Sequence, residues 1–193
     1  MMKISNSTEF VILGALMTGS KHGYEIMQFL SSALEPAWRV STSQLYLLLK
    51  RLELAGMVDS SLETQKTRPS KRVYGLTNLG RKVFAQWLQT PVEHVRDFRT
   101  EFLTKMFFFH HLALPGADRL LEGQIRAIEK LRLRVHDRKK MEDDVFMALV
   151  YGFKNHTIES LLTWLRQDVR TFVKEGIRDR SAAVPKRDKK RHS

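Results

Sequence analysis

Residues 41–77 read STSQLYLLLKRLELAGMVDSSLETQKTRPSKRVYGLT, and this stretch decides the fold of the N-terminal half. Its first part predicts a helix, because leucines recur at the i, i+3, i+4 and i+7 spacing of one helical face. Ser41 or Thr42 can cap the start of this helix. Gly56 ends it, since glycine adopts the left-handed conformation without a Cβ penalty. The leucines of the apolar side are Leu45, Leu48, Leu49 and Leu52.

Two short strands are expected after this helix, at Met57–Glu63 and Lys71–Thr77, where apolar and polar residues alternate. The loop between them, TQKTRPS, is basic and is interrupted by Pro69. A helix followed by a hairpin with a cationic tip is typical of a winged helix. Such a helix fits the major groove of DNA, and the wing reaches the backbone or the minor groove.

The candidate DNA contacts lie on the helix and the wing. Side chains in the first turn, Ser43 and Gln44, can reach base edges. The Tyr46 hydroxyl and the Lys50 ammonium can meet phosphate oxygens, and the wing cations are expected mainly to give affinity. Arg72→Ala should therefore weaken binding to all sequences alike and lower the salt slope by about one. The full candidate set is Ser41, Ser43, Gln44, Tyr46, Lys50, Lys66, Arg68, Lys71, Arg72 and Tyr74.

Three runs in this half resemble the PadR family of transcriptional regulators: KHGYEI at 21–26, LYLLLKRLELAGMV at 45–58 and RPSKRVYGLTNLGR at 68–81. The resemblance covers about residues 8–90. Thr67 stands where relatives often have glycine before the Arg-Pro pair. The resemblance implies a winged helix-turn-helix protein that regulates transcription as a homodimer on a palindromic operator, more often as a repressor than as an activator. The C-terminal half looks like the helical half of the longer, virulence-activator-like members.

The remaining elements are predicted from caps, breakers and apolar periodicity. The N-terminal ones are a helix from Ser7 or Thr8 to Gly19, a helix from His22 to Pro36, a strand at Trp38–Val40 and a helix from Thr77 to Pro91. The C-terminal ones are helices at Glu93–His111, Ala117–Met141 and Asp144–Glu175, the last bent near Gly152. The fold class is mainly α with a small β-hairpin. We expect a winged-helix DNA-binding domain at 1–90, an antiparallel long-helix dimerisation domain at 91–178 and a basic disordered tail at 179–193.

The two long C-terminal helices each carry one apolar stripe, and such helices are marginally stable alone. One alternative is that the stripes pack against each other. The other, which we favour, is that they also pack against a second copy, as the resemblance implies. The residues expected to support dimerisation are Leu121, Ile125, Ile128, Leu131, Val135, Ile158, Leu161, Leu165, Val169 and Phe172.

Composition narrows the class of protein. The 193 residues contain no cysteine and carry a net charge of +12, which favours a polyanionic partner such as double-stranded promoter DNA. The excess is uneven, at +5 over residues 1–90, +2 over 91–176 and +5 over 177–193. The longest apolar run, Phe10–Met17, is too short to span a bilayer, so we expect a soluble, cytoplasmic protein with no membrane partner and no signal peptide.

Catalytic and metal chemistry find no support in the motifs. Nucleophile elbows and phosphate-binding loops are absent from the sequence, so we expect neither an enzyme nor a cofactor. His110 and His111 are adjacent and would point about 100° apart on a helix, which makes them a poor ligand pair. We expect no metal site.

Two features keep alternatives open. The Phe107–Phe109 run, with Trp87 and Trp164, either fills a core or lines a pocket for a small aromatic or hydrophobic effector, as in some family members. The basic tail is either a DNA clamp or a solubilising segment. At the level of function, the rivals to a sequence-specific regulator are a non-specific nucleoid-type DNA binder and a winged-helix protein-interaction module.

Overall fold

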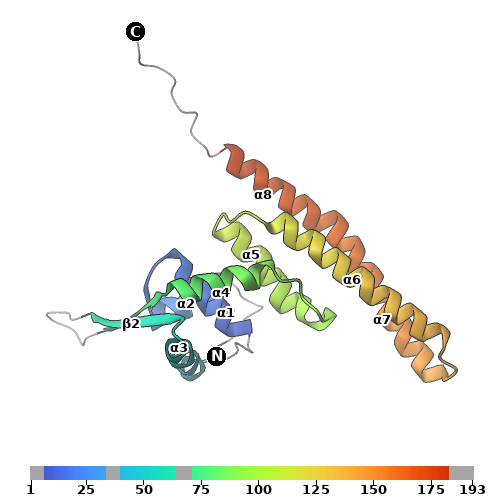
Figure 1. The fold of residues 1–193 in the computed structure, drawn as a ribbon, viewed down its shortest axis with the longest axis horizontal. Coiled ribbons are helices and arrows are strands. Elements are labelled where there is room, and N and C mark those ends of the chain that lie inside the picture. Colours follow the sequence, from blue (N-terminus) through green and yellow to red (C-terminus); the bar gives the residue numbers. More distant parts are fainter. Residues whose placement is uncertain (1–6, 34–39, 64–70, 183–193) are drawn as a thin grey trace, which may run out of the picture. The chain divides into compact units, whose positions relative to one another are not determined.

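The computed structural model describes residues 7–33, 40–63 and 71–182, and the chain divides into two compact units, Met1–Leu114 and Pro115–Ser193 (Figure 1). The division falls after α5 (Leu103–His111), whereas the sequence placed the boundary at Pro91. Ring packing explains the difference. Phe108 of α5 lies edge-on to Phe84 with ring centroids 5.2 Å apart, and a Cβ on Gly14 would lie 2.2 Å from its ring. Residues 91–114 therefore pack as part of the N-terminal unit.

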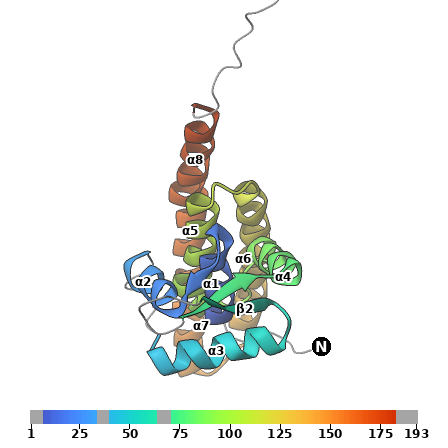
Figure 2. The ribbon, with the colours of Figure 1, turned by 90° about the vertical axis from the view of Figure 1, so that its left-hand side faces the viewer.

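The N-terminal unit combines helices with a small antiparallel sheet. Its α-helices and strands before α5 are α1 (Ser7–Ala15), β1 (Lys21–His22), α2 (Gly23–Ala33), α3 (Thr42–Leu54), β2 (Val58–Glu63), β3 (Lys71–Leu76) and α4 (Asn78–Gln89), and a 3₁₀ turn at Leu16–Thr18 follows α1. Figure 2 looks onto α3 and the strand β2 beside it. The predicted helix, hairpin and following helix are confirmed, and the order of elements is that of a winged helix.

Local capping works as the sequence indicated. The Ser41 side chain accepts a hydrogen bond from the Gln44 N–H at 3.2 Å, and Thr77 accepts one from the Gly80 N–H at 3.1 Å. Gly56 has φ +69°, the left-handed conformation that ends α3. The two caps fix where α3 and α4 begin, and the Gly56 conformation fixes where α3 ends.

The sheet has the strand order β1-β3-β2, and its third strand is not the predicted one. Lys21 pairs with Tyr74, so the outer edge of β3 is covered by the segment just before α2. The predicted strand at Trp38–Val40 lies mostly outside the described residues, and Val40 is not in a strand. Strand pairing is a contact between distant segments, which local alternation cannot assign.

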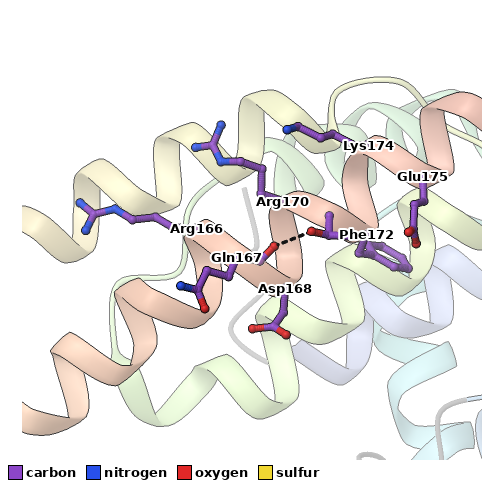
Figure 3. A pocket seen from close by; sticks show the side chains of 8 residues that line it. Arg166, Gln167, Asp168, Arg170, Phe172, Lys174 and Glu175 are labelled. Carbon is purple, nitrogen blue, oxygen red and sulfur yellow. Dashed lines mark hydrogen bonds between the residues drawn. The ribbon is translucent and has the colours of Figure 1, made fainter.

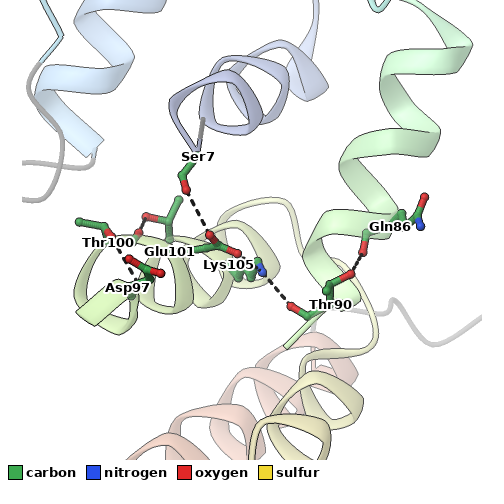
Figure 4. A network of polar contacts seen from close by, with 8 residues as sticks. Ser7, Gln86, Thr90, Asp97, Thr100, Glu101 and Lys105 are labelled. Carbon is green, nitrogen blue, oxygen red and sulfur yellow. Dashed lines mark hydrogen bonds and ion pairs between the residues drawn. The ribbon is translucent and has the colours of Figure 1, made fainter. Parts of the chain in front are cut away.

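A buried lysine fastens the start of α5 to the end of α4 (Figure 4). Lys105 has no exposed surface, and its Nζ donates to the Thr90 carbonyl at 2.7 Å and to Glu101 Oε1 at 2.6 Å. Ser7 at the start of α1 donates to the other oxygen of Glu101 at 3.1 Å. The ammonium also lies 4.9 Å from the ring centroid of Trp87. Burial lowers the pKa of Lys105, while Glu101 opposes that shift.

The predicted helix Glu93–His111 is irregular at its start. A 3₁₀ turn occupies Val95–Asp97 and a π turn occupies Phe98–Phe102 before α5 begins. Phe98 and Phe102 are both buried, with ring centroids 5.1 Å apart. The irregular turns thus place both rings inside the unit.

The C-terminal unit is built on two long helical segments. α6 (Ala117–Lys140) turns back through residues 141–144 into α7 (Val145–Trp164), and a π turn at Leu165–Val169 leads into α8 (Arg170–Ala182). Figure 1 shows α6 running alongside α7 and α8. Arg132 pairs with Glu159 at 3.4 Å and Arg170 with Glu122 at 2.8 Å across the two segments.

Two expectations about this unit need correction. The helix passes through Gly152 without interruption, and the irregularity lies at the π turn instead. A helical glycine loses backbone entropy but does not by itself break a helix. The helix also continues to Ala182, beyond Asp179 where the tail was expected to begin, and residues 183–193 lie outside the described part. In the described residues, no helix combines the length and the apolar character that a bilayer crossing requires.

Candidate nucleic-acid interface

The core of the N-terminal unit sets the orientation of α3. All four leucines of the predicted apolar side are buried. From α1, the buried carboxylate of Glu9 reaches Arg51, with 3.4 Å between Oε1 and Nε. The opposite side of α3 is therefore held outward, and the side chains that it exposes are Ser43, Gln44, Tyr46, Leu47, Lys50 and Leu54.

The predicted base-reading residues lie where they were expected. Ser43 and Gln44 are exposed in the first turn of α3, and Lys50 is exposed two turns further on. Ser41 is exposed too, but its hydroxyl is engaged in capping the helix. This exposed face can present side chains to a groove without disturbing the core.

Sequence reasoning missed Leu47, which keeps 59% of its surface exposed in the middle of this polar face. An exposed leucine at that position fits apolar contact with a thymine methyl group in the major groove. The signal was present in the sequence. Leu47 falls on the side of the helix opposite to the leucine stripe.

The two tyrosines of the candidate set differ in accessibility. Tyr46 is about half exposed, and its hydroxyl rests against α2, where a Cβ on Gly23 would lie 2.6 Å away. Tyr74 is only 4% exposed, so it offers little surface for its predicted DNA contact, which stays a prediction. Its burial raises the pKa of the phenol, although the neighbouring Arg72 opposes the shift.

The wing cations are also in different situations. Lys66 and Arg68 lie outside the described residues. Lys71 is exposed at the start of β3, opposite Glu63 in the register, and forms no ion pair with the described residues. The Arg72 guanidinium, in contrast, pairs with Glu53 of α3, with Nη2 3.2 Å from Oε1.

A shallow hollow of about 430 Å³ separates the exposed face of α3 from β3. Tyr46, Lys50, Glu53, Leu54, Arg72 and Tyr74 line it. Two cations, Lys50 and Arg72, and the carboxylate of Glu53 therefore face the same space between α3 and the wing.

The C-terminal unit places the predicted dimerisation residues mostly inside one chain. Leu131 and Leu161 are half-buried, and Phe172 is 39% exposed. A second copy cannot reach the others while the helices stay packed. The buried ones are Leu121, Ile125, Ile128, Val135, Ile158, Leu165 and Val169.

Apolar surface remains free on another side of the C-terminal helices. Phe146, Leu149 and Phe153 fall at i, i+3 and i+7 on α7 and are each about 70% exposed. Leu133 of α6 is also exposed. Three consecutive turns of exposed large side chains form a stripe that can meet a partner.

A second hollow of about 520 Å³ lies along the π turn and α8 (Figure 3). Arg166, Arg170 and Lys174 stand in a row along one edge of it. Arg166 pairs with Glu129 and Arg170 pairs with Glu122, both on α6. These ion pairs fasten the two helical segments together, and they leave the edge of the hollow largely neutralised.

The aromatic run of α5 mainly fills the core. Phe108 and Phe109 are at most 1% exposed. Phe107 is half-buried and stacks on His111, with ring centroids 5.1 Å apart. The ring of Phe29 on α2 lies 6.1 Å from that of Phe107. The three rings therefore contribute to packing, which was the first of the two alternatives for this run.

Comparison with known proteins finds similarity to transcriptional regulators. Residues 12–86 match the Transcriptional regulator PadR-like family. The negative transcriptional regulator PadR of Bacillus subtilis is 31% identical over 121 residues, and a probable transcriptional regulator of Mycobacterium tuberculosis is 29% identical over 93 residues. These alignments cover 61% and 48% of this chain. The chain spans 65% of the first relative's length and 49% of the second's.

A similar solved structure is that of Bacillus subtilis PadR in complex with operator DNA. It is 24% identical and has a TM-score of 0.43. The similarity covers 86% of this chain and 99% of that one.

Proposed function

Because residues 12–86 carry the domain of the PadR-like transcriptional regulators, we propose that this chain is a sequence-specific DNA-binding regulator of transcription. The observation that carries the proposal is the exposed face of α3. Its polar side chains and Leu47 point outward next to a hairpin that bears cations, while its four leucines anchor it in the core. A helix held in this way fits the major groove.

The proposed contacts divide into base readers and phosphate contacts. Ser43 and Gln44 read base edges, and Leu47 packs against a thymine methyl group. Lys50 and Lys71 neutralise phosphates and so supply affinity that falls with salt. Lys66 and Arg68 of the wing remain candidates for the same role.

We further propose that the regulator acts in the cytoplasm as a homodimer on a palindromic operator. A two-fold dimer presents two α3 helices to half-sites about one helical turn apart. The exposed stripe of Phe146, Leu149 and Phe153 on α7 supports this assembly, because a second copy would cover it. The buried residues named for dimerisation would then support the interface from within each chain.

Repression is the proposed sign of regulation, since the Bacillus subtilis relative is a negative regulator. Control by a small aromatic or hydrophobic effector is part of the same proposal. Such a molecule would act by favouring a dimer whose heads do not match the operator spacing. Differential affinity for the two dimer states would be required.

The DNA proposal is tested by fluorescence anisotropy across a salt series. The protein is titrated against the DNA upstream of its own gene and against a shuffled duplex. We expect a preference of about 10³-fold or more, as specific binders show. Equal and steeply salt-dependent binding to both duplexes would instead indicate a nucleoid-type protein. No binding to either duplex at low salt would favour a protein-interaction module.

The dimer proposal is tested by sedimentation of a Phe146→Ser/Phe153→Ser variant. Both side chains are exposed, so the chain should fold and sediment as a monomer that has lost tight operator binding. Lys154→Ser, one residue along the same helix, is the control and should remain dimeric. An intact dimer in the double variant would show that the interface lies elsewhere.

A further inference from the structure

Arg72 connects the three elements of the proposed DNA-reading head. Its Nε donates to Ser60 Oγ on β2 at 2.8 Å, and its Nη2 donates to Glu53 Oε1 on α3 at 3.2 Å. Ser60 Oγ in turn donates to the same Glu53 oxygen at 2.5 Å. The Glu53–Ser60–Arg72 cluster therefore ties the last turn of α3 to both strands of the wing.

The sheet beneath the cluster fixes where Arg72 can reach. Ser60 lies opposite Tyr74 and Leu62 lies opposite Arg72 in the β2–β3 register, so Ser60 and Arg72 are diagonal neighbours. The guanidinium carbon also lies 5.9 Å from the ring centroid of the buried Tyr74. Arg72 thus rests on a side chain that belongs to the core.

The charge of Arg72 is balanced before any DNA arrives. One guanidinium and one carboxylate give the cluster no net charge. The Nε and Nη2 atoms of Arg72 already donate hydrogen bonds within the cluster. A neutral cluster releases few counterions when DNA binds, so it contributes little to a salt-dependent affinity. The neighbouring Lys71 is exposed and forms no ion pair with the described residues, although Glu63 lies opposite it in the register, so its ammonium is more available to a phosphate than the guanidinium of Arg72.

We propose that Arg72 is a positioning residue, which acts through Glu53 and Ser60 to hold the wing at a fixed distance from the recognition helix. This inference rests on the proposed function. With the spacing fixed, α3 can lie in the groove and the wing on the DNA backbone in only one register. A non-cognate DNA sequence then cannot be accommodated by a movement of the wing relative to α3. The cluster therefore supports discrimination between sequences more than affinity for DNA in general.

The sign of the Glu53 effect separates this role from direct phosphate contact. If Arg72 binds phosphate, removal of Glu53 frees the guanidinium, and affinity rises for every sequence alike while the preference for the specific site stays unchanged. If the cluster positions the wing, removal of Glu53 releases the wing, and the preference for the specific site falls. The same two models also differ for Arg72 itself, because only a phosphate contact changes the salt slope.

The test compares Arg72→Ala, Glu53→Ala and the double variant with wild type by anisotropy on the specific and shuffled duplexes. We expect each single change to lower the preference for the specific duplex by roughly tenfold, and the double variant to be no worse than either. Arg72→Ala should leave the salt slope unchanged. Lys71→Ala is the matched control and should lower the slope by about one at constant preference.

Hydrogen exchange of the free protein gives a second readout that does not depend on DNA. Amides of β2 and β3 should exchange faster in Arg72→Ala and Glu53→Ala, but not in Lys71→Ala, because only the cluster restrains the wing. An unchanged preference for the specific duplex in Glu53→Ala, or unchanged exchange in both cluster variants, would overturn the positioning role. A wild-type protein without sequence preference would overturn the proposed function and with it the role in specificity, whatever the exchange rates show.

Discussion

Replacing Lys105 by methionine tests whether the buried lysine holds the N-terminal unit together. Methionine keeps an unbranched side chain but removes the ammonium that bonds the Thr90 carbonyl and Glu101. Breaking a buried ion pair from one side typically costs about 3–5 kcal/mol of unfolding free energy. Glu101 keeps 22% of its side chain exposed, so water can solvate part of the orphaned carboxylate. We therefore expect a loss near the lower end, about 3 kcal/mol.

The assay is urea unfolding followed by far-UV circular dichroism, which avoids the change in fluorescence that the nearby Trp87 would show. In a thermal scan the same loss should lower the midpoint by about 10 °C. Arg96→Met is the control, because this cation is 80% exposed and its pairing with Asp97 should be worth less than about 1 kcal/mol. If Lys105→Met, like the Arg96→Met control, has the same free energy of unfolding as wild type, the Lys105 interactions only offset the cost of burying its charge. That result would refute the reasoning.

Three further predictions concern pH and glycines. The pKa of Lys105 is lowered in the folded state, so the unfolded chain keeps this proton to higher pH than the folded one. The free energy of unfolding of wild type, relative to that of Lys105→Met, should therefore rise as the pH approaches 10.5, and urea titrations of both proteins would check this. Gly14→Ala should lower the free energy of unfolding by about 1–3 kcal/mol, because its Cβ would collide with the Phe108 ring. Adding Phe108→Leu to that variant should restore part of the loss. Gly56→Ala should lower the free energy of unfolding by about 1 kcal/mol, because alanine is strained at φ +69°. Gly152→Ala should raise the free energy of unfolding by up to about 1 kcal/mol, because its Cβ would meet open space and alanine favours a helix; calorimetry would check both.

Local chemistry determined much of the N-terminal unit from the sequence alone. The leucine spacing of α3, the caps at Ser41 and Thr77, and the glycine after the helix act over a few residues, so they could be predicted without knowing what lies nearby. The exposed positions of Ser43, Gln44 and Lys50 followed from the same spacing. The winged-helix fold and the exposed face of α3 were therefore predictable.

Other features depended on segments that are distant in sequence. Glu53 and Arg72 are 19 residues apart, and only the folding of β3 beside α3 turns a predicted phosphate contact into an ion pair. Tyr74 is buried although Arg72, on the same face of β3, is exposed, a difference that strand alternation cannot predict. Lys105 became buried because α5 packs into the N-terminal unit. Sequence periodicity shows that a helix has an apolar face but not what covers that face. Only the tertiary structure shows that most apolar residues predicted for dimerisation pack within one chain, while Phe146, Leu149 and Phe153 stay exposed.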